Sequence, residues 1–367
     1  MTDTEPKKVF VAATKQDQGK TTVSLGLMAA LCDLNPPVGF IKPVGQRYVE
    51  VDGVRVDEDV ALMRTIFPTD CALSDMSPVT VGRSFTRDYI RDPHPDELMN
   101  RIRESFGRLA AGKATVVIEG TGHAGVGSCF DASNADVAAL LGAKVILVTA
   151  GGIGRPIDEV MLNVSLFRDR GVEFLGVVLN KVLPSKLERI DEVVRAGLRR
   201  KGIELLGCVP LEPKLSRPSV RQVLEEIDGE LLNGEVSVGN KIDAVIVGAM
   251  SAHHALGYMT PHCLLITPGD RDDLILAAMS TYVVGKDGAP TLSGILLTGG
   301  RRPHRNVLDL IHRTEVPVVL VDGDSYSTAA AVNNLKVKIQ PGDEDKISIA
   351  PRLIRENVDV ERILERL

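Results

Sequence analysis

The sequence predicts an α/β protein in two parts: a mostly parallel sheet with helices on both faces, followed by a smaller α/β domain. Short β-branched runs alternate with longer amphipathic stretches, which is the pattern of βαβ units. The chain has 367 residues, too many for one ordinary domain and few for three. The alternation weakens once, over residues 228–240, and then restarts. We therefore expect two domains.

The first domain is expected to contain six buried strands. Uninterrupted Val/Ile/Leu runs are typical of strands that are covered on both faces. These runs are residues 9–13, 38–42, 115–119, 144–149, 174–180 and 205–209, and helical patterns between them include 21–32, 95–109, 156–168 and 187–200. We assign residues 1–228 to this domain.

The second domain follows a segment, 229–240, whose Gly, Asn and acidic residues predict a linker. Strand runs then cover 242–249, 263–267, 294–298 and 316–321, and helical patterns cover 272–284, 304–313 and 325–335. We assign residues 241–345 to this domain and 346–367 to a helical tail. From residue 351 the apolar residues recur at helical spacing, which predicts an amphipathic helix packed on a neighbouring element.

Composition excludes several functional classes. Hydrophobic residues make up 44% and charged residues 25%, which excludes disorder as the main state. The net charge of −6 provides no excess of positive charge for binding nucleic acid or anionic lipid. The five cysteines are scattered and form no CxxC pair, which indicates buried thiols in a reducing compartment. No signal peptide or membrane-spanning run is found, and we expect a cytoplasmic protein without nucleic-acid or membrane partners.

The strongest local signal is the segment 13–22, which reads Ala-Thr-Lys-Gln-Asp-Gln-Gly-Lys-Thr-Thr. It follows a strand run and opens an amphipathic helix, as a phosphate-binding loop requires. Lys20 would neutralise the β/γ-phosphate charge, and the Thr21 hydroxyl sits where a Mg²⁺ ligand is needed. Thr14 stands where the general motif has its first glycine. The alternative is that Gly19-Lys20-Thr21 only caps a helix.

A second signal is a strand that ends in a carboxylate, Glu119, before Gly120-Thr121-Gly122. A carboxylate at that end of a strand is well placed to hold Mg²⁺ beside a phosphate loop. The alternative is a strand-terminal Glu before turn glycines. The triplet Asp57-Glu58-Asp59 offers a further carboxylate, or forms the acidic first turn of a helix.

Five motifs in this order resemble dethiobiotin synthetase and its relatives, which include the cobyrinic acid a,c-diamide synthases. They are Gly19-Lys20-Thr21, Lys42-Pro43-Val44, Asp59, Glu119-Gly120-Thr121-Gly122 and Asn180-Lys181, within residues 8–228. The resemblance implies ATP and Mg²⁺ as cofactors, with Thr21, Asp59 and Glu119 as metal ligands. It also implies that Lys42 meets the carboxylate or carbamate that attacks the γ-phosphate.

The remaining site residues follow from the same resemblance and from the loop. The candidate catalytic residues are Lys20, Lys42 and Asp17. The candidate nucleotide contacts are Thr14, Lys15, Gln18, Gly19, Lys20, Thr21, Thr22, Asn180 and Pro210. Among them, Asn180 and the backbone near Pro210 would read the adenine edge.

The substrate contacts depart from the family pattern. The chain has Gln16 and Asp17 where dethiobiotin synthetases carry a threonine and an acidic residue, and Gln46 where they carry a serine. Neither Cys208 nor Cys263 lies in a nucleophile elbow, so glutamine-dependent amidation by this chain is not expected. Lys15 suggests another relationship, because partitioning-type ATPases place a lysine there that reaches across a dimer.

Residues 241–345 resemble the DRTGG domain, through Asp270-Arg271 and Thr298-Gly299-Gly300. The same pair of domains precedes the catalytic domain in some phosphotransacetylases, which implies a ligand-sensing or assembly module. Arg301 and Arg302 either help to hold an anion or are exposed residues of a plain turn. The arginines 83, 87 and 91 either line an anionic cleft or form a solvated helix face.

Three functional hypotheses remain. The first is an ATP- and Mg²⁺-dependent enzyme that transfers the γ-phosphate to a small carboxylate or carbamate. The second is a regulatory protein that binds or slowly hydrolyses nucleotide and senses a ligand through the DRTGG domain. The third is a dimeric partitioning-type ATPase switch. The expected partners are a nucleotide, a small anionic substrate and a second copy of the chain in a homodimer. The sequence leaves open whether the protein turns over ATP.

Overall fold

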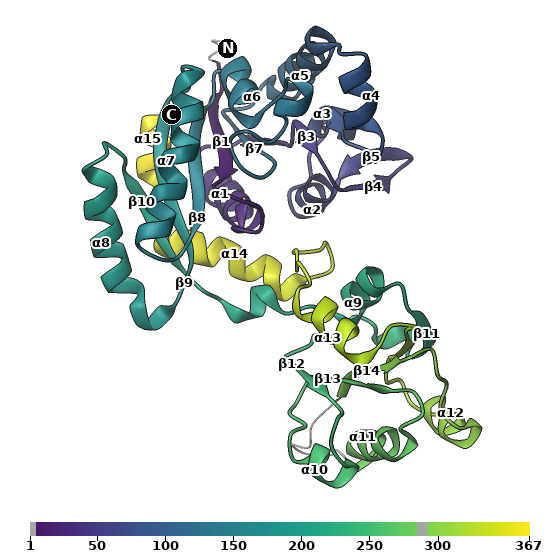
Figure 1. Cartoon of the computed structure of the whole chain (residues 1–367). Coiled ribbons are helices and arrows are strands. Elements are labelled where there is room, and N and C mark those ends of the chain that lie inside the picture. The colour runs from purple at the N-terminus through teal and green to yellow at the C-terminus, as the bar shows by residue number, and fades with distance from the viewer. Residues whose placement is uncertain (1–4, 285–291) are drawn as a thin grey trace. The chain divides into compact units, whose positions relative to one another are not determined.

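The computed structural model describes residues 5–284 and 292–367 (Figure 1). They form two compact units, and the chain returns to the first after completing the second. Unit 1 comprises Met1–Glu212 and Ile339–Leu367, and unit 2 comprises Pro213–Lys338. Unit 2 is therefore an insertion in the sequence of unit 1, whereas the sequence patterns suggested two consecutive domains and a tail.

Unit 1 contains a six-stranded parallel sheet in the order β10-β9-β8-β1-β7-β2. This confirms the predicted fold class. The strands are β1 (Lys7–Ala13), β2 (Val38–Ile41), β7 (Thr115–Glu119), β8 (Lys144–Ala150), β9 (Phe174–Val182) and β10 (Leu205–Pro210). All five residues of β7 are buried, as expected for a central strand covered on both faces.

The helices of unit 1 alternate with these strands, and two short strand pairs lie between β2 and β7. The helices are α1 (Lys20–Leu34), α2 (Glu58–Ile66), α3 (Leu73–Met76), α4 (Phe85–Arg91), α5 (Pro95–Ala110), α6 (Asn134–Leu141), α7 (Gly154–Asp169), α8 (Leu187–Arg199), α14 (Glu344–Asn357) and α15 (Val360–Arg366). The pairs are β3 (Val44–Gly45) with β6 (Val79–Thr80), and β4 (Tyr48–Val51) with β5 (Val54–Asp57).

The C-terminal residues pack on unit 1, where Figure 1 shows the yellow helices α14 and α15 beside α1. Gly26 of α1 lies close against α14, because a Cβ atom there would lie 2.5 Å from Cβ of Ile354. Between the two helices, Val358 forms an antiparallel bridge with Gly207, and the Asp359 N–H donates to the Leu206 carbonyl at 3.0 Å. The segment thereby pairs with the edge strand β10.

Unit 2 contains a five-stranded sheet in the order β11-β15-β14-β13-β12, parallel except for β11. The strands are β11 (Glu230–Asn233), β12 (Ala244–Val247), β13 (Cys263–Pro268), β14 (Leu292–Thr298) and β15 (Val318–Leu320). The helices are α9 (Val220–Ile227), α10 (Ala252–Leu256), α11 (Asp272–Val284), α12 (Arg305–Ile311) and α13 (Ser325–Asn333). Two apolar clusters form its core, one with side chains of α10, α11 and α12, the other with side chains of α9 and α13.

The segment 229–240 does not form the linker that its composition predicted. It contains β11, which pairs with β15, and the Asn233 side-chain amide donates to the Thr314 and Val316 carbonyls at 2.9 Å each. A short antiparallel strand at a sheet edge carries little of the apolar signal that marks a buried strand. Unit 2 also includes α9, which the assignment of residues 241–345 left in the first domain.

The cysteines are less uniformly buried than their scatter suggested. All five are free thiols, of which Cys208 and Cys263 are buried, Cys32 and Cys71 are half-buried and Cys129 is exposed. In the described parts of the chain, none of the helices combines the length and apolar character that a membrane span needs.

We predict that Gly26→Ala destabilises the protein by about 1–2 kcal/mol, because overpacking against Ile354 outweighs the gain in helix propensity. The matched control is Gly107→Ala in α5, where a Cβ atom meets nothing within 4 Å, and this change should stabilise by about 0.5–1 kcal/mol. Urea denaturation measures both. Equal stabilisation by the two changes would show that α14 does not pack closely on α1.

Candidate nucleotide-binding site

The predicted site residues lie at one edge of the unit 1 sheet. The phosphate loop follows β1, Lys42 follows β2, Glu119 ends β7, Asn180 lies near the end of β9, and Pro210 ends β10. Because these strands are parallel, their carboxyl ends share one edge, where open α/β sheets bind ligands. The topology therefore gathers segments that are up to about 200 residues apart in the sequence.

The loop between β1 and α1 leaves the first turn of the helix open. Gly19 is the N-cap with φ of 85°, no side chain caps the helix, and its first turn contains no acidic residue. A Cβ atom on Gly19 would also collide with the Asn180 side chain. Only glycine satisfies both constraints. The first N–H groups of α1 are thus suited to an anion.

Thr14 replaces the usual first glycine without strain. It is not among the residues with positive φ, and its side chain is buried. Its hydroxyl lies 3.0 Å from the Thr149 hydroxyl and 3.2 Å from Glu159 Oε2. Glu159 of α7 also forms an ion pair with Lys15, at 2.6 Å. Lys15 is therefore paired within its own chain.

Two adjacent residues of β9 hold the loop from the other side. Asn180 Nδ2 donates to the Gln18 carbonyl at 2.9 Å, and Lys181 Nζ donates to the Asp17 carbonyl at 2.7 Å. Asp17 itself is exposed and has φ of 61°. The sequence suggested adenine contact for Asn180, whereas in this structure its amide supports the loop. The role of Lys181 was not anticipated, although its place beside Asn180 was visible.

Lys42 lies at the centre of a group of buried acids that we call the carboxylate cluster: Asp57, Asp59 and Glu119. Its ammonium is 3.2 Å from Asp57 Oδ1 and 3.3 Å from Glu119 Oε1, and it is bonded to Asp59. None of these four side chains is more than 5% exposed. The Thr21 hydroxyl donates to Asp59 Oδ1 at 3.1 Å and lies 3.3 Å from Glu119 Oε1. The structure thus brings together Thr21, Asp59, Glu119 and Lys42.

The charges of this cluster influence one another. Burial alone would lower the pKa of Lys42, but Asp59, Glu119 and Asp57 outweigh it and hold that pKa well above its usual range. Burial raises the pKa of Glu119 to about 7, helped by Asp59 and opposed by Lys42 and Lys20. The pKa of the Glu119 carboxyl thus stays above its usual range even with Lys42 beside it, because burial disfavours the ionised form.

The residues present fit a magnesium ion. Glu119 Oε2 is buried, and among the described residues it has no hydrogen-bond partner. Carboxylate and hydroxyl oxygens are the ligands that Mg²⁺ prefers. No group of three or more His, Cys, Asp or Glu side chains is arranged as a metal site in the described ranges 5–284 and 292–367. The acids are arranged around Lys42 instead.

For the other predicted residues the structure gives a position but little indication of a role. Thr22 lies in the first turn of α1, and Pro210 is half-buried at the end of β10. Arg87 and Arg91 belong to α4 and Arg83 precedes it, and all three are exposed. Arg87 pairs with Asp88 at 3.1 Å, which suits a solvated helix face.

The arginines of unit 2 also have acidic partners. Arg301 pairs with Asp270 at 2.5 Å and Arg302 with Glu230 at 2.6 Å. The Thr298 hydroxyl, at the end of β14, lies 2.7 Å from the Ser325 hydroxyl. An anion in this region would have to compete with these carboxylates for the guanidinium groups.

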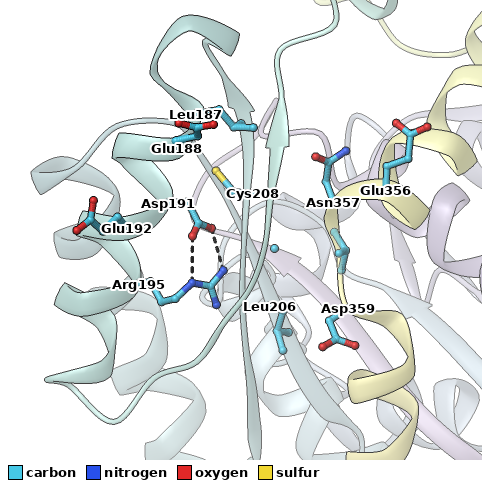
Figure 2. Close-up of a pocket in the computed structure, with 12 residues that line it drawn as sticks. Leu187, Glu188, Asp191, Glu192, Arg195, Leu206, Cys208, Glu356, Asn357 and Asp359 are labelled. Atoms are coloured by element: carbon cyan, nitrogen blue, oxygen red, sulfur yellow. Dashed lines mark hydrogen bonds and ion pairs between the residues drawn. The ribbon is translucent and has the colours of Figure 1, made fainter.

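Unit 1 has a cavity that is not lined by the phosphate loop. An open cavity of about 620 Å³ lies between α8, the edge strand β10 and the segment 356–359, and Figure 2 shows the side chains that line it. Five carboxylates line it: Glu188, Asp191, Glu192, Glu356 and Asp359. Arg195 also lines it and is bonded to Asp191 at 2.8 and 3.1 Å. None of the predicted site residues lines this cavity.

Comparison with known proteins adds the family. A family model described as an AAA domain matches residues 7–219, and one described as a DRTGG domain matches residues 222–335. Phosphate acetyltransferase of Pseudomonas putida is 30% identical over 378 residues, and that of Nitratidesulfovibrio vulgaris is 28% identical over 370. These alignments cover 97% and 98% of this chain but 51% of each relative. The chain thus spans about half the length of these relatives.

A solved structure of the cell-division protein MinD from Aquifex aeolicus is also similar. Its TM-score is 0.36 at 15% sequence identity, over 57% of this chain and 84% of that chain.

Lys181→Met should loosen the phosphate loop, because it removes the donor to the Asp17 carbonyl. We expect amide hydrogen exchange in residues 15–19 to accelerate about tenfold, the equivalent of one hydrogen bond. The matched control is Lys186→Met, at an exposed lysine of the following turn, which should leave the loop unchanged. Unchanged exchange in the Lys181 variant would mean that Lys181 does not hold the loop.

Proposed function

The chain belongs to the AAA domain family that matches its residues 7–219, and we propose that unit 1 binds ATP with Mg²⁺ and transfers the γ-phosphate to a small carboxylate or carbamate. The observation that carries this proposal is the convergence of the open α1 N-terminus, Thr21, Lys42 and two carboxylates at one sheet edge.

The nucleotide phosphates would lie over the first turn of α1. The helix N-terminus supplies uncapped N–H donors, and Lys20 supplies a cation at the first helical position. The contacts from Asn180 and Lys181 keep the loop in shape for this role, so that less order has to be gained on binding. Adenine recognition by Asn180 would require its amide to change partners, and the backbone near Pro210 would assist.

Thr21, Asp59 and Glu119 would hold Mg²⁺, which supplies charge screening for the phosphates. The Thr21 hydroxyl already lies 3.1 Å from Asp59 Oδ1 and 3.3 Å from Glu119 Oε1.

Lys42 favours phosphoryl transfer over simple binding. An attack by a carboxylate or carbamate on the γ-phosphate brings two anions together, so cations must be held between them. Lys42, which follows β2, is a second lysine at this edge, whereas Lys20 begins α1.

The alternative is a regulatory protein that binds nucleotide without transfer and senses a ligand through its DRTGG domain. The two matched domains together, an AAA domain followed by a DRTGG domain, support this alternative. The third hypothesis, a dimeric ATPase switch, would require Lys15 to exchange Glu159 for a partner's phosphates.

Titration calorimetry with ATP and MgCl₂ tests nucleotide binding. We expect Lys20→Ala to weaken ATP binding about 100-fold, because a charge-assisted contact to phosphate is lost. The control Lys201→Ala changes an exposed lysine of the turn after α8 and should bind ATP as the wild type does. The proposal fails if the wild type does not bind ATP, or if Lys20→Ala binds it equally well.

Transfer is tested by ADP release across a panel of small carboxylates and amines with bicarbonate. We expect release above the acceptor-free rate with at least one acceptor, and a loss of about 100-fold in that rate for Lys42→Met. Tight ATP binding with no acceptor-dependent release would favour the regulatory alternative.

A further inference from the structure

The ammonium of Lys42 contacts the same oxygens that a metal ion would use. It lies 3.3 Å from Glu119 Oε1, the atom that the Thr21 hydroxyl also approaches, and it is bonded to Asp59. A Mg²⁺ ion needs its ligands at about 2.0–2.1 Å in a near-octahedral arrangement. Two cations this close to the same carboxylates repel each other strongly in a buried site.

We propose that Lys42 is the internal counter-ion of the carboxylate cluster while no divalent cation is bound, and that it releases Asp59 and Glu119 when Mg²⁺ binds, which makes its ammonium available to the anionic substrate. This rests on the proposed function in taking Mg²⁺ as the cation and an anion as the substrate. The lysine would thereby couple metal binding to substrate capture.

Three observations carry this inference. The ammonium of Lys42 is in contact with all three buried carboxylates at once, so an incoming cation would have to share or take over the same oxygens. Glu119 Oε2 is buried and has no partner among the described residues, so one acid is incompletely satisfied. The four-carbon stem of lysine is flexible and lets the charge move without a backbone change.

Asp57 differs from the other two acids and keeps the cluster in place. Its side chain accepts a hydrogen bond from the Asp59 N–H at the start of α2, and its own N–H donates to the Ser77 hydroxyl at 3.0 Å. The Thr21 hydroxyl contacts Asp59 and Glu119. Lys42 would therefore release Asp59 and Glu119, while Asp57 stays fixed by α2.

Thermal unfolding without nucleotide tests the exchange of cations. Lys42→Met removes the ammonium but keeps most of the side-chain volume. We expect its Tm to fall by about 10 °C, because breaking a buried ion pair leaves uncompensated charge. Millimolar MgCl₂ should restore at least half of that loss, whereas NaCl at equal ionic strength should not. The wild type should gain less than about 2 °C from MgCl₂.

Two double variants keep the test decisive if Lys42→Met does not fold. K42M/D57N and K42M/D59N both remove one acid with the lysine, so both carry the same net charge. Asn at position 57 can still cap α2. We expect MgCl₂ to stabilise K42M/D57N by several degrees and to have no effect on K42M/D59N, which lacks a metal ligand.

The inference is overturned if neither Lys42→Met nor K42M/D57N gains stability from MgCl₂ beyond the NaCl control, or if both double variants gain equally. Because these melts contain no nucleotide, they are independent of the ATP titration. A protein that failed to bind ATP would contradict the proposed function while leaving the exchange of cations measurable.

Discussion

Unit 1 holds the ammonium of Lys42 in its interior, which is tolerated only because Asp57, Asp59 and Glu119 surround it. These residues come from three segments: Lys42 follows β2, the two aspartates lie at the start of α2, and Glu119 ends β7. A buried charge without partners is far less stable than one that is paired. The cluster therefore fixes the register of these segments, and β2 and β7 are neighbours in the sheet.

The carboxylate cluster is also hydrogen-bonded to the phosphate loop. The Thr21 hydroxyl joins the phosphate loop to the cluster, so the loop, the strand ends and α2 form one polar network. On the opposite side of the loop, Asn180 and Lys181 bind its carbonyl oxygens. The loop is thus held from two directions. Such support allows the α1 N-terminus to remain uncapped and open to an anion.

The sequence predicted much of this because buried parallel strands have a strong signature. All six long strands of unit 1 and most of its larger helices lie within a few residues of the predicted ranges, since their apolar runs are uninterrupted. The resemblance to dethiobiotin synthetase implied a site containing Lys42, Asp59, Glu119 and Thr21. For Glu119 the strand pattern gave a physical reason as well, because the carboxyl ends of parallel strands share one edge of the sheet.

The structure differs from the sequence-based predictions where an element depends on contacts between residues far apart in the chain. The strand β11 is an antiparallel edge strand in a segment rich in Gly, Asn and acidic residues, so its sequence lacks the apolar run that revealed the equally short edge strand β2. The return of α14 and α15 to α1 depends on the small Gly26 opposite Ile354, which no local pattern reveals. The pairing of Lys15 with Glu159, and the contact of Lys181 with the loop, likewise join residues more than 140 positions apart.

The most direct test is a crystal structure of the protein with Mg²⁺ and a non-hydrolysable ATP analogue. The account predicts phosphates over the first turn of α1, Mg²⁺ bound by Thr21 and the two acids Asp59 and Glu119, and the Lys42 ammonium withdrawn from Glu119. Nucleotide bound elsewhere, or Lys42 still lying between these carboxylates with the metal present, would contradict it.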